Sequence, residues 1–216
     1  MRQPAVCPIC GKRRAERFCP AKGESICAVC CATEREKTID CPSGCPHLIA
    51  AHRWEEDRRK PPAESELAFP DVSVPPDLIH EHRALVTGIS LAIVDRAAEE
   101  PALVDADLFA ALSALAETYR TLGAGLYYEN PPAAAIPHAL YSALGKYLQE
   151  WKEKGAAEAR VPPARDAEVF RLLVFLIRFG RPRSNGRPRT RGFLDFLRTQ
   201  FPAARRAAEA PRIITP

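Results

Sequence analysis

The eight cysteines of this 216-residue chain all lie in its first 45 residues, and the 171 residues that follow contain none. A segment of about forty residues is too short to bury a sufficient apolar core by itself. The clustering therefore predicts a small module whose fold depends on the chemistry of its cysteines. Their order is Cys7-x2-Cys10, Cys19, Cys27-x2-Cys30, Cys31 and Cys41-x3-Cys45.

Two of the cysteine pairs have the spacing of a tetrahedral zinc site. Cys7 and Cys10 form one pair, Cys27 and Cys30 form the other, and sixteen residues separate them. Two thiolates on one tight turn can bind the same ion, and a second turn completes the tetrahedron. The other four cysteines are enough for a second ion, so we predict two structural zinc sites. The predicted ligands are Cys7, Cys10, Cys27 and Cys30 for one ion and Cys19, Cys31, Cys41 and Cys45 for the other.

Other uses of these cysteines stay open at this stage. A disulfide framework would need an oxidising compartment, and Met1 to Cys10 lacks the apolar stretch of an export signal. A catalytic zinc would need a coordination position left open to water or substrate. A thiol redox sensor would need a cysteine free of metal, for which Cys31 is the candidate. His47 can replace one cysteine in the second site.

The interleaved pairs resemble the cross-brace zinc fingers of the B-box and HIT types, over Cys7 to about His52. The resemblance implies that Cys7, Cys10, Cys27 and Cys30 bind one ion and that Cys19, Cys41 and Cys45 supply three ligands to the other. The fourth ligand is expected a few residues after Cys19, where this chain has Lys22, so Cys31 becomes the candidate. Fingers of these types usually mediate contacts with other proteins.

A second resemblance rests on residues 27–35 (CAVCCATER) and 39–48 (IDCPSGCPHL). These two strings are similar to a family of uncharacterised bacterial zinc-finger proteins. That family brings no known activity, but the resemblance implies a cytoplasmic bacterial protein.

The rest of the chain has the apolar periodicity of helices. Helices are expected over 48–60, 77–99, 105–126, 137–155, 169–179 and 191–201, with Asp77 capping the second, Gly155 ending the fourth and 169–179 at the centre of the core. The predicted fold is a small N-terminal two-zinc cross-brace finger followed by an all-α helical bundle. The predicted domains are a cysteine-rich module (1–52), a helix end and Pro-rich linker (53–76), the bundle (77–201) and a C-terminal tail (202–216).

Charge is unevenly distributed along the chain. The overall net charge is +4, but residues 61–177 carry nine basic and seventeen acidic side chains, and residues 178–216 carry ten basic and two acidic ones. Arg178 to Arg191 contains six arginines and no acid. Guanidinium groups on a loop suit phosphates, so a nucleic-acid contact is one hypothesis. The other is that this segment pairs with acids within the chain. The candidate phosphate contacts are Arg181, Arg183, Arg187, Arg189 and Arg191.

The sequence shows no nucleophile elbow, phosphate-binding glycine loop or carboxylate pair at a mechanistic spacing. The longest apolar run, Leu172 to Ile177, is six residues and cannot cross a membrane. We therefore expect a non-enzymatic cytoplasmic adaptor whose zinc finger presents a surface to a protein partner. The alternative is a regulatory protein that binds nucleic acid through residues 178–191.

Overall fold

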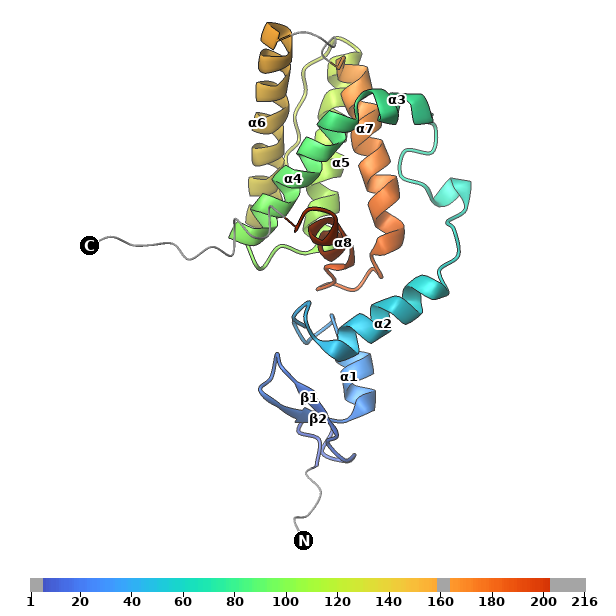
Figure 1. Ribbon diagram of the computed structural model, residues 1–216, viewed down its shortest axis with the longest axis vertical. Coiled ribbons are helices and arrows are strands. Elements are labelled where there is room, and N and C mark those ends of the chain that lie inside the picture. Colours follow the sequence, from blue (N-terminus) through green and yellow to red (C-terminus); the bar gives the residue numbers. More distant parts are fainter. Residues whose placement is uncertain (1–5, 159–163, 203–216) are drawn as a thin grey trace, which may run out of the picture.

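The computed structural model describes residues 6–158 and 164–202, which form a small N-terminal part and a larger helical part (Figure 1). The described chain is mostly helical, as the sequence predicts, and it also contains one two-stranded sheet. We call residues 6–57 the finger and residues 76–200 the bundle. In chain order the elements are β1 (Arg17–Cys19), β2 (Glu24–Ile26), α1 (Ala28–Glu34), α2 (Pro46–Asp57), the 3-10 helix η1 (Glu64–Glu66), α3 (Pro76–Glu81), α4 (Arg83–Glu99), α5 (Asp105–Gly123), α6 (Ala135–Glu158), α7 (Asp166–Gly180), the 3-10 helix η2 (Arg181–Arg183) and α8 (Gly192–Gln200).

The finger is built around a β-hairpin and two helices. Strands β1 and β2 pair antiparallel, with Phe18 opposite Ser25, and the turn between them contains Gly23 at φ 69°. This left-handed backbone conformation suits glycine because it has no Cβ. Ile26 and Ile39 are almost fully buried, and cysteines provide the rest of the finger's core.

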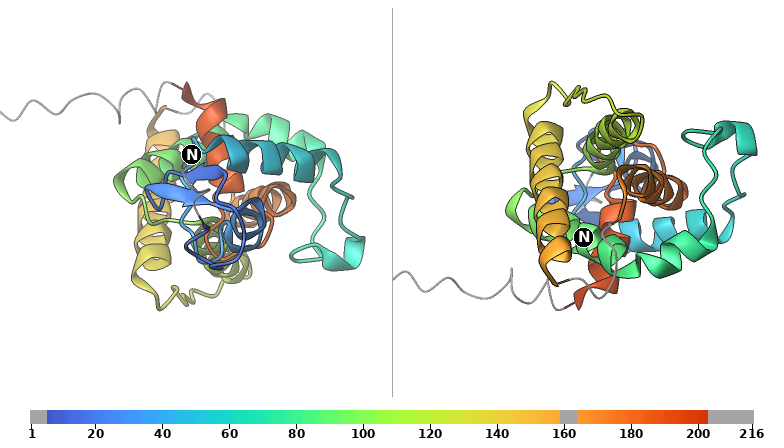
Figure 2. Two further views of the ribbon diagram at one scale, coloured as in Figure 1. Left: turned by 90° about the horizontal axis from the view of Figure 1, so that it is seen from below. Right: turned by 90° about the horizontal axis from the view of Figure 1, so that it is seen from above.

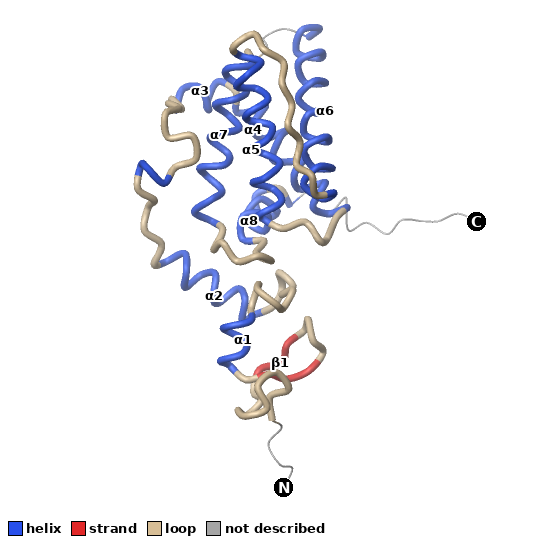
Figure 3. The backbone as a smooth tube through the Cα atoms, turned by 180° about the vertical axis from the view of Figure 1, so that it is seen from behind, coloured by secondary structure: helices blue, strands red, loops and turns tan. Residues whose placement is uncertain are grey.

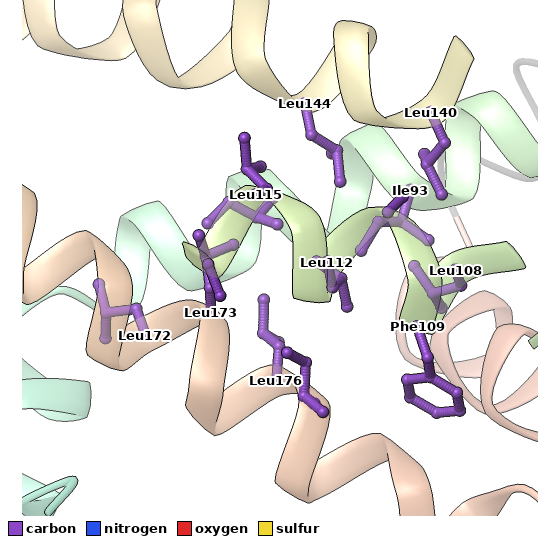
Figure 4. Packing of buried hydrophobic residues seen from close by; sticks show 14 of the residues in the cluster. Ile93, Leu108, Phe109, Leu112, Leu115, Leu140, Leu144, Leu172, Leu173 and Leu176 are labelled. Atoms are coloured by element: carbon purple, nitrogen blue, oxygen red, sulfur yellow. The ribbon is translucent and has the colours of Figure 1, made fainter. Parts of the chain in front are cut away.

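Helix α5 lies at the centre of the bundle, between α6 on one side and α7 on the other (Figure 4). Leu112 and Leu115 of α5 point into the contacts with both neighbours. The sequence predicts residues 169–179 as the central helix. That segment forms most of α7 and is largely buried, but α5 contacts α6, α7 and α8 and so occupies the central position. The facing leucines are Leu140 and Leu144 on α6 and Leu172, Leu173 and Leu176 on α7.

Three of the expected helix boundaries are wrong. The helix expected over 77–99 is broken at His82 (φ −101°, ψ 25°), and its N-cap residue is Pro75, so Asp77 lies in the first turn of α3. The break lets α3 pack on α7 while α4 packs on α6. Helix α5 ends at Gly123, before Leu126, and Gly125 follows with φ 81°. Helix α6 continues past Gly155, at a cost of about 1 kcal/mol relative to alanine.

The loop between α5 and α6 runs the length of the bundle, so that both helices point in the same direction (Figure 3). Gly88 on α4 allows α4 and α6 to pack closely, because a Cβ there would overlap the side chain of Tyr147 on α6.

The connector between finger and bundle, residues 58–75, passes along one side of the molecule (Figures 1 and 2). Its second half is held by Arg178 of α7, which the sequence assigns to the basic segment. The Arg178 guanidinium donates hydrogen bonds of 3.0 Å to the carbonyl of Ala68, 2.6 Å to that of Phe69 and 2.8 Å to that of Val72. The predicted linker is therefore anchored to the bundle over these residues. The predicted tail beyond residue 202 lies outside the described residues.

None of the helices in the described part of the chain is both long enough and apolar enough to cross a bilayer.

Candidate metal centre and the contact between finger and bundle

Four cysteines of the finger gather in one place. The sulfur atoms of Cys7, Cys10, Cys27 and Cys30 all lie within 4.8 Å of one another, and the Cys10 and Cys27 sulfurs are 4.0 Å apart. Four thiolates bound to a zinc ion at 2.3 Å would have their sulfurs about 3.8 Å apart. The donor set and its spacing therefore fit one tetrahedral ion with only a small contraction. None of the eight cysteines is disulfide-bonded.

Two local turns position these thiols. In the first, the N–H of Gly11 donates to the carbonyl of Cys7 at 2.8 Å, and Gly11 has φ 61°, a left-handed conformation that suits glycine. In the second, Cys27 is the N-cap of α1, and its sulfur accepts the N–H of Cys30 at 3.3 Å. Each C-x2-C pair is thus fixed by backbone hydrogen bonds.

The electrostatics of the cluster favour a bound cation. The backbone N–H groups of Lys12 and Arg13 lower the pKa of the Cys10 thiol to about 6. Burial, together with hydrogen bonds to the neighbouring thiols, raises the pKa of Cys30 to about 12. Four thiols this close cannot all ionise without a compensating charge, and a divalent ion supplies that charge.

The other four cysteines are less tightly grouped. Among the described residues, only the first set brings three or more ligand atoms so close together. Cys19 and Cys45 are buried, and Cys41 is half-buried. Burial raises the pKa of Cys41, and the nearby charges of Cys45, Glu36 and Cys19 raise it further, so these groups are neighbours. Cys31 packs against the cysteine core, and His47 is half-buried on α2.

A buried carboxylate, Glu36, joins the finger to the bundle. Its side chain is 1% exposed, and its backbone has φ 56°. His52 Nε2 lies 3.0 Å from both carboxylate oxygens, and Asn185 Nδ2 of the bundle donates to one of them at 2.8 Å. Burial by itself would raise the pKa of Glu36, but these hydrogen bonds lower it below its ordinary value. The hydrogen bond to the carboxylate in turn raises the pKa of His52. The Arg189 N–H donates to the Glu36 carbonyl at 2.9 Å.

Two arginines of the basic segment extend this contact. Arg187 Nη1 donates to the carbonyl of Arg35 at 2.6 Å and to that of Ala32 at 3.2 Å. Arg191 Nη1 pairs with Asp40 of the finger at 2.6 Å. We call Glu36, His52, Asn185 and Arg187 the clasp.

The remaining predicted phosphate contacts differ in their surroundings. The Arg183 guanidinium lies 3.7 Å from the ring centroid of Phe179, and that of Arg181 lies 5.2 Å from the ring centroid of Phe109. Arg189 is exposed, and its side chain makes no hydrogen bond or ion pair within the described residues. Four of the five predicted arginines therefore have partners inside the molecule. These partners are mainly carbonyls and aromatic rings, with one acid of the finger, rather than the acids of residues 61–177.

Asp105 is a further buried acid that sequence reasoning placed only at a helix start. It is fully buried, and its two carboxylate oxygens accept the N–H groups of Phe193 and Leu194 at 3.0 and 3.1 Å. Asp105 thus accepts hydrogen bonds from two N–H groups in the first turn of α8, about 88 residues away along the chain, which have no partner within the helix. Burial raises the pKa of Asp105 to about 6.

An open groove of about 930 Å³ lies where the finger meets the bundle, between residues 40–56 on one side and α4 and α8 on the other. Two of the three arginines along it are paired, Arg191 with Asp40 and Arg198 with Asp195, and Arg53 makes no ion pair within the described residues. The groove therefore combines paired and unpaired charges with an apolar surface that includes Ile49, Ala98 and Pro101.

Comparison of the chain with protein-family models, with curated proteins and with solved structures finds no match. The functional argument accordingly rests on the residues and their geometry.

Proposed function

We propose that this chain is a non-enzymatic zinc-binding interaction protein, in which a metal-stabilised finger held on a helical bundle presents its outer surface to another macromolecule. The observation that carries the proposal is the cluster of Cys7, Cys10, Cys27 and Cys30. Four thiolates fill a tetrahedral coordination sphere and leave no position for water or substrate, which is the arrangement of a structural site. Cysteines must be reduced to bind zinc, and this requirement favours the cytoplasm as the location of the protein.

A second zinc ion belongs to the same proposal. Its ligands would be Cys19, Cys41 and Cys45, with Cys31 or His47 as the fourth. Burial raises the pKa of Cys41, and the nearby charges of Cys45, Glu36 and Cys19 raise it further, which supports this grouping. A cation there would relieve the repulsion between the thiolates.

Native mass spectrometry of the purified protein, with elemental analysis, tests both ions. We expect two zinc ions and eight reduced thiols per chain. One ion would contradict the second site, and disulfides without zinc would overturn the proposal. Replacement by Co²⁺ tests whether the sites are closed. Absorption bands typical of tetrahedral thiolate coordination are expected, whereas an oxygen ligand from water would favour a catalytic ion instead.

The surface of the finger supports an interaction role. Phe18 and Val29 are 61% and 46% exposed, and Ile9 also faces solvent, in a part of the chain with few apolar side chains. A photo-crosslinking residue at Val29 should capture a partner in cells only while the metal is bound. The control position is Leu126 of the bundle, 63% exposed. Equal capture from both positions, or none from Val29, would contradict the proposed role of the finger.

A further inference from the structure

The chain contains two eleven-residue segments with five basic side chains each, residues 12–22 and residues 181–191. In the second segment, hydrogen bonds, an ion pair and cation–π contacts engage Arg181, Arg183, Arg187 and Arg191 inside the molecule. In the first segment, which we call the fingertip, no basic side chain makes a hydrogen bond or ion pair to any described residue. The five are Lys12, Arg13, Arg14, Arg17 and Lys22.

The fingertip is also largely exposed. It includes β1 and lies at the end of the molecule opposite the bundle (Figure 1). Lys12, Arg13, Arg14 and Lys22 are exposed, Arg17 is half-buried, and Glu16 is the only acid between residues 12 and 22. These cations are therefore accessible to a group outside the described residues.

An exposed aromatic ring lies in the middle of the same segment. Phe18 is 61% exposed, while the next residue, Cys19, is buried, because successive side chains of β1 point to opposite faces. Its cross-strand partner is the small residue Ser25, which leaves the ring uncovered. A ring in this position can stack on a nucleobase, since every base has an apolar face.

We propose that the fingertip binds single-stranded nucleic acid, with its cations on the phosphates and Phe18 stacked on a base. This inference rests on the proposed function and names the partner of the finger. The zinc–thiolate group is itself anionic, but its sulfurs are largely shielded, with Cys7 and Cys30 buried, so an approaching phosphate meets the guanidinium groups first. Arginine predominates among the five cations and matches phosphate geometry by paired hydrogen bonds.

The test uses the full zinc-loaded chain with two fluorescent probes, a 20-nucleotide oligo(U) RNA and oligo(dT) of the same length, measured by anisotropy. If all five cations contact phosphates, log K should fall with log salt at a slope of about −3.5, or roughly 100-fold between 50 and 200 mM salt. Arg13→Gln/Arg14→Gln/Arg17→Gln should reduce the magnitude of that slope by about 2. Arg83→Gln/Lys146→Gln/Arg171→Gln, which removes the same charge from the bundle surface, should leave the slope almost unchanged.

Phe18 provides an independent test. Phe18→Leu keeps an apolar side chain but removes the ring, and it should weaken binding by roughly 5- to 100-fold at constant salt slope. Phe18→Trp should restore binding. Because residue 18 is exposed, neither change should disturb the hairpin.

Four results would overturn the proposal. The first is absence of binding to either probe at 50 mM salt, and the second is an equal loss of nucleic-acid affinity in the fingertip and bundle variants. The third is equally tight binding of a 20-residue poly-glutamate. The fourth is loss of zinc in the triple fingertip variant together with normal binding of the probes by Phe18→Leu. The third would indicate an acidic protein partner, and the fourth would mean that the cations only balance the thiolates. Zinc content is measured in every sample, so absence of nucleic-acid binding in a zinc-loaded protein leaves the proposed function intact.

Discussion

The finger and the bundle bury different kinds of core. The buried core of the finger consists of four cysteines with Ile26 and Ile39, whereas the bundle buries leucine, isoleucine, valine and phenylalanine from six helices. An apolar core is stable wherever water is excluded from it. The cysteine core proposed here depends in addition on reduced thiols and a bound cation. Two parts of one chain thus respond to different chemical conditions, and the following variants test that difference.

Removal of metal should have the largest effect, and only on the finger. A structural zinc site supplies folding free energy on the order of 10 kcal/mol. Treatment with a chelator, or Cys27→Ser, should abolish protection of the amides of residues 7–45 in hydrogen exchange followed by mass spectrometry. Protection in α5 and α7 should persist. A finger that keeps its protection after confirmed loss of metal would contradict the assignment of the cluster.

Truncation of a side chain in the bundle core should destabilise the bundle and leave the finger folded. Leu112 of α5 is fully buried in the bundle core, so Leu112→Ala should reduce the free energy of unfolding by about 2–5 kcal/mol. The zinc content should not change. Leu126→Ala, at an exposed position, should change the free energy by no more than about 0.5 kcal/mol. Comparable losses from both variants would contradict the described packing.

Asp105 makes the bundle sensitive to pH. Burial, with a smaller contribution from Asp195, raises the pKa of Asp105 from 3.8 to about 6, so the folded state binds its proton more tightly than the unfolded state. As pH rises from about 3 to about 7, the bundle should therefore lose about 3 kcal/mol of stability. Asp105→Asn should remove this dependence. Urea denaturation, monitored by Trp151 fluorescence in a Trp54→Phe background, measures the free energy of unfolding at each pH. An unchanged pH profile in Asp105→Asn would assign the pH dependence to other groups.

The clasp should contribute the smallest effect and connect the two parts. Asn185→Ala removes a donor to a buried carboxylate, which should cost about 1–3 kcal/mol, and Arg187→Ala removes donors to two finger carbonyls. We expect faster hydrogen exchange in residues 32–40 and 185–191, with zinc still bound. Arg189→Ala is the matched control, because its side chain makes no hydrogen bond or ion pair within the described residues. The same acceleration in that control would show that the clasp is not the connection.

Local patterns predicted much of the fold. The 3.6-residue periodicity located α5, α7 and α8 to within a few residues, and the C-x2-C spacing identified the four cysteines that the structure gathers. The break at His82 was missed because Leu78, His82 and Leu85 keep the helical interval through it. The helix divides there because α3 and α4 pack on different neighbours, which is a tertiary effect.

The clasp was not predictable from local patterns. Asn185 and Glu36 are 149 positions apart, and no periodicity relates them. Asn185-Gly186 indicates only a turn. The arginine-rich composition of residues 181–191 suggested an external anion, because composition does not reveal that backbone carbonyls are the acceptors. The uncovered fingertip cations became apparent only when the partners of both segments could be compared.

The burial of Glu36 limits how far this molecule can be divided. A fragment cut after residue 60 would keep every cysteine, but it would lack Asn185 and the Arg189 N–H, which bind Glu36. The Glu36 carboxylate, which is buried in the whole chain, would then face solvent beside His52. A fragment beginning at residue 76 would expose the other half of the same contact. We therefore expect the finger to need its contact with the bundle and not to behave as an independent domain. Grafting it onto another scaffold would require a replacement for the surface formed by residues 185–191.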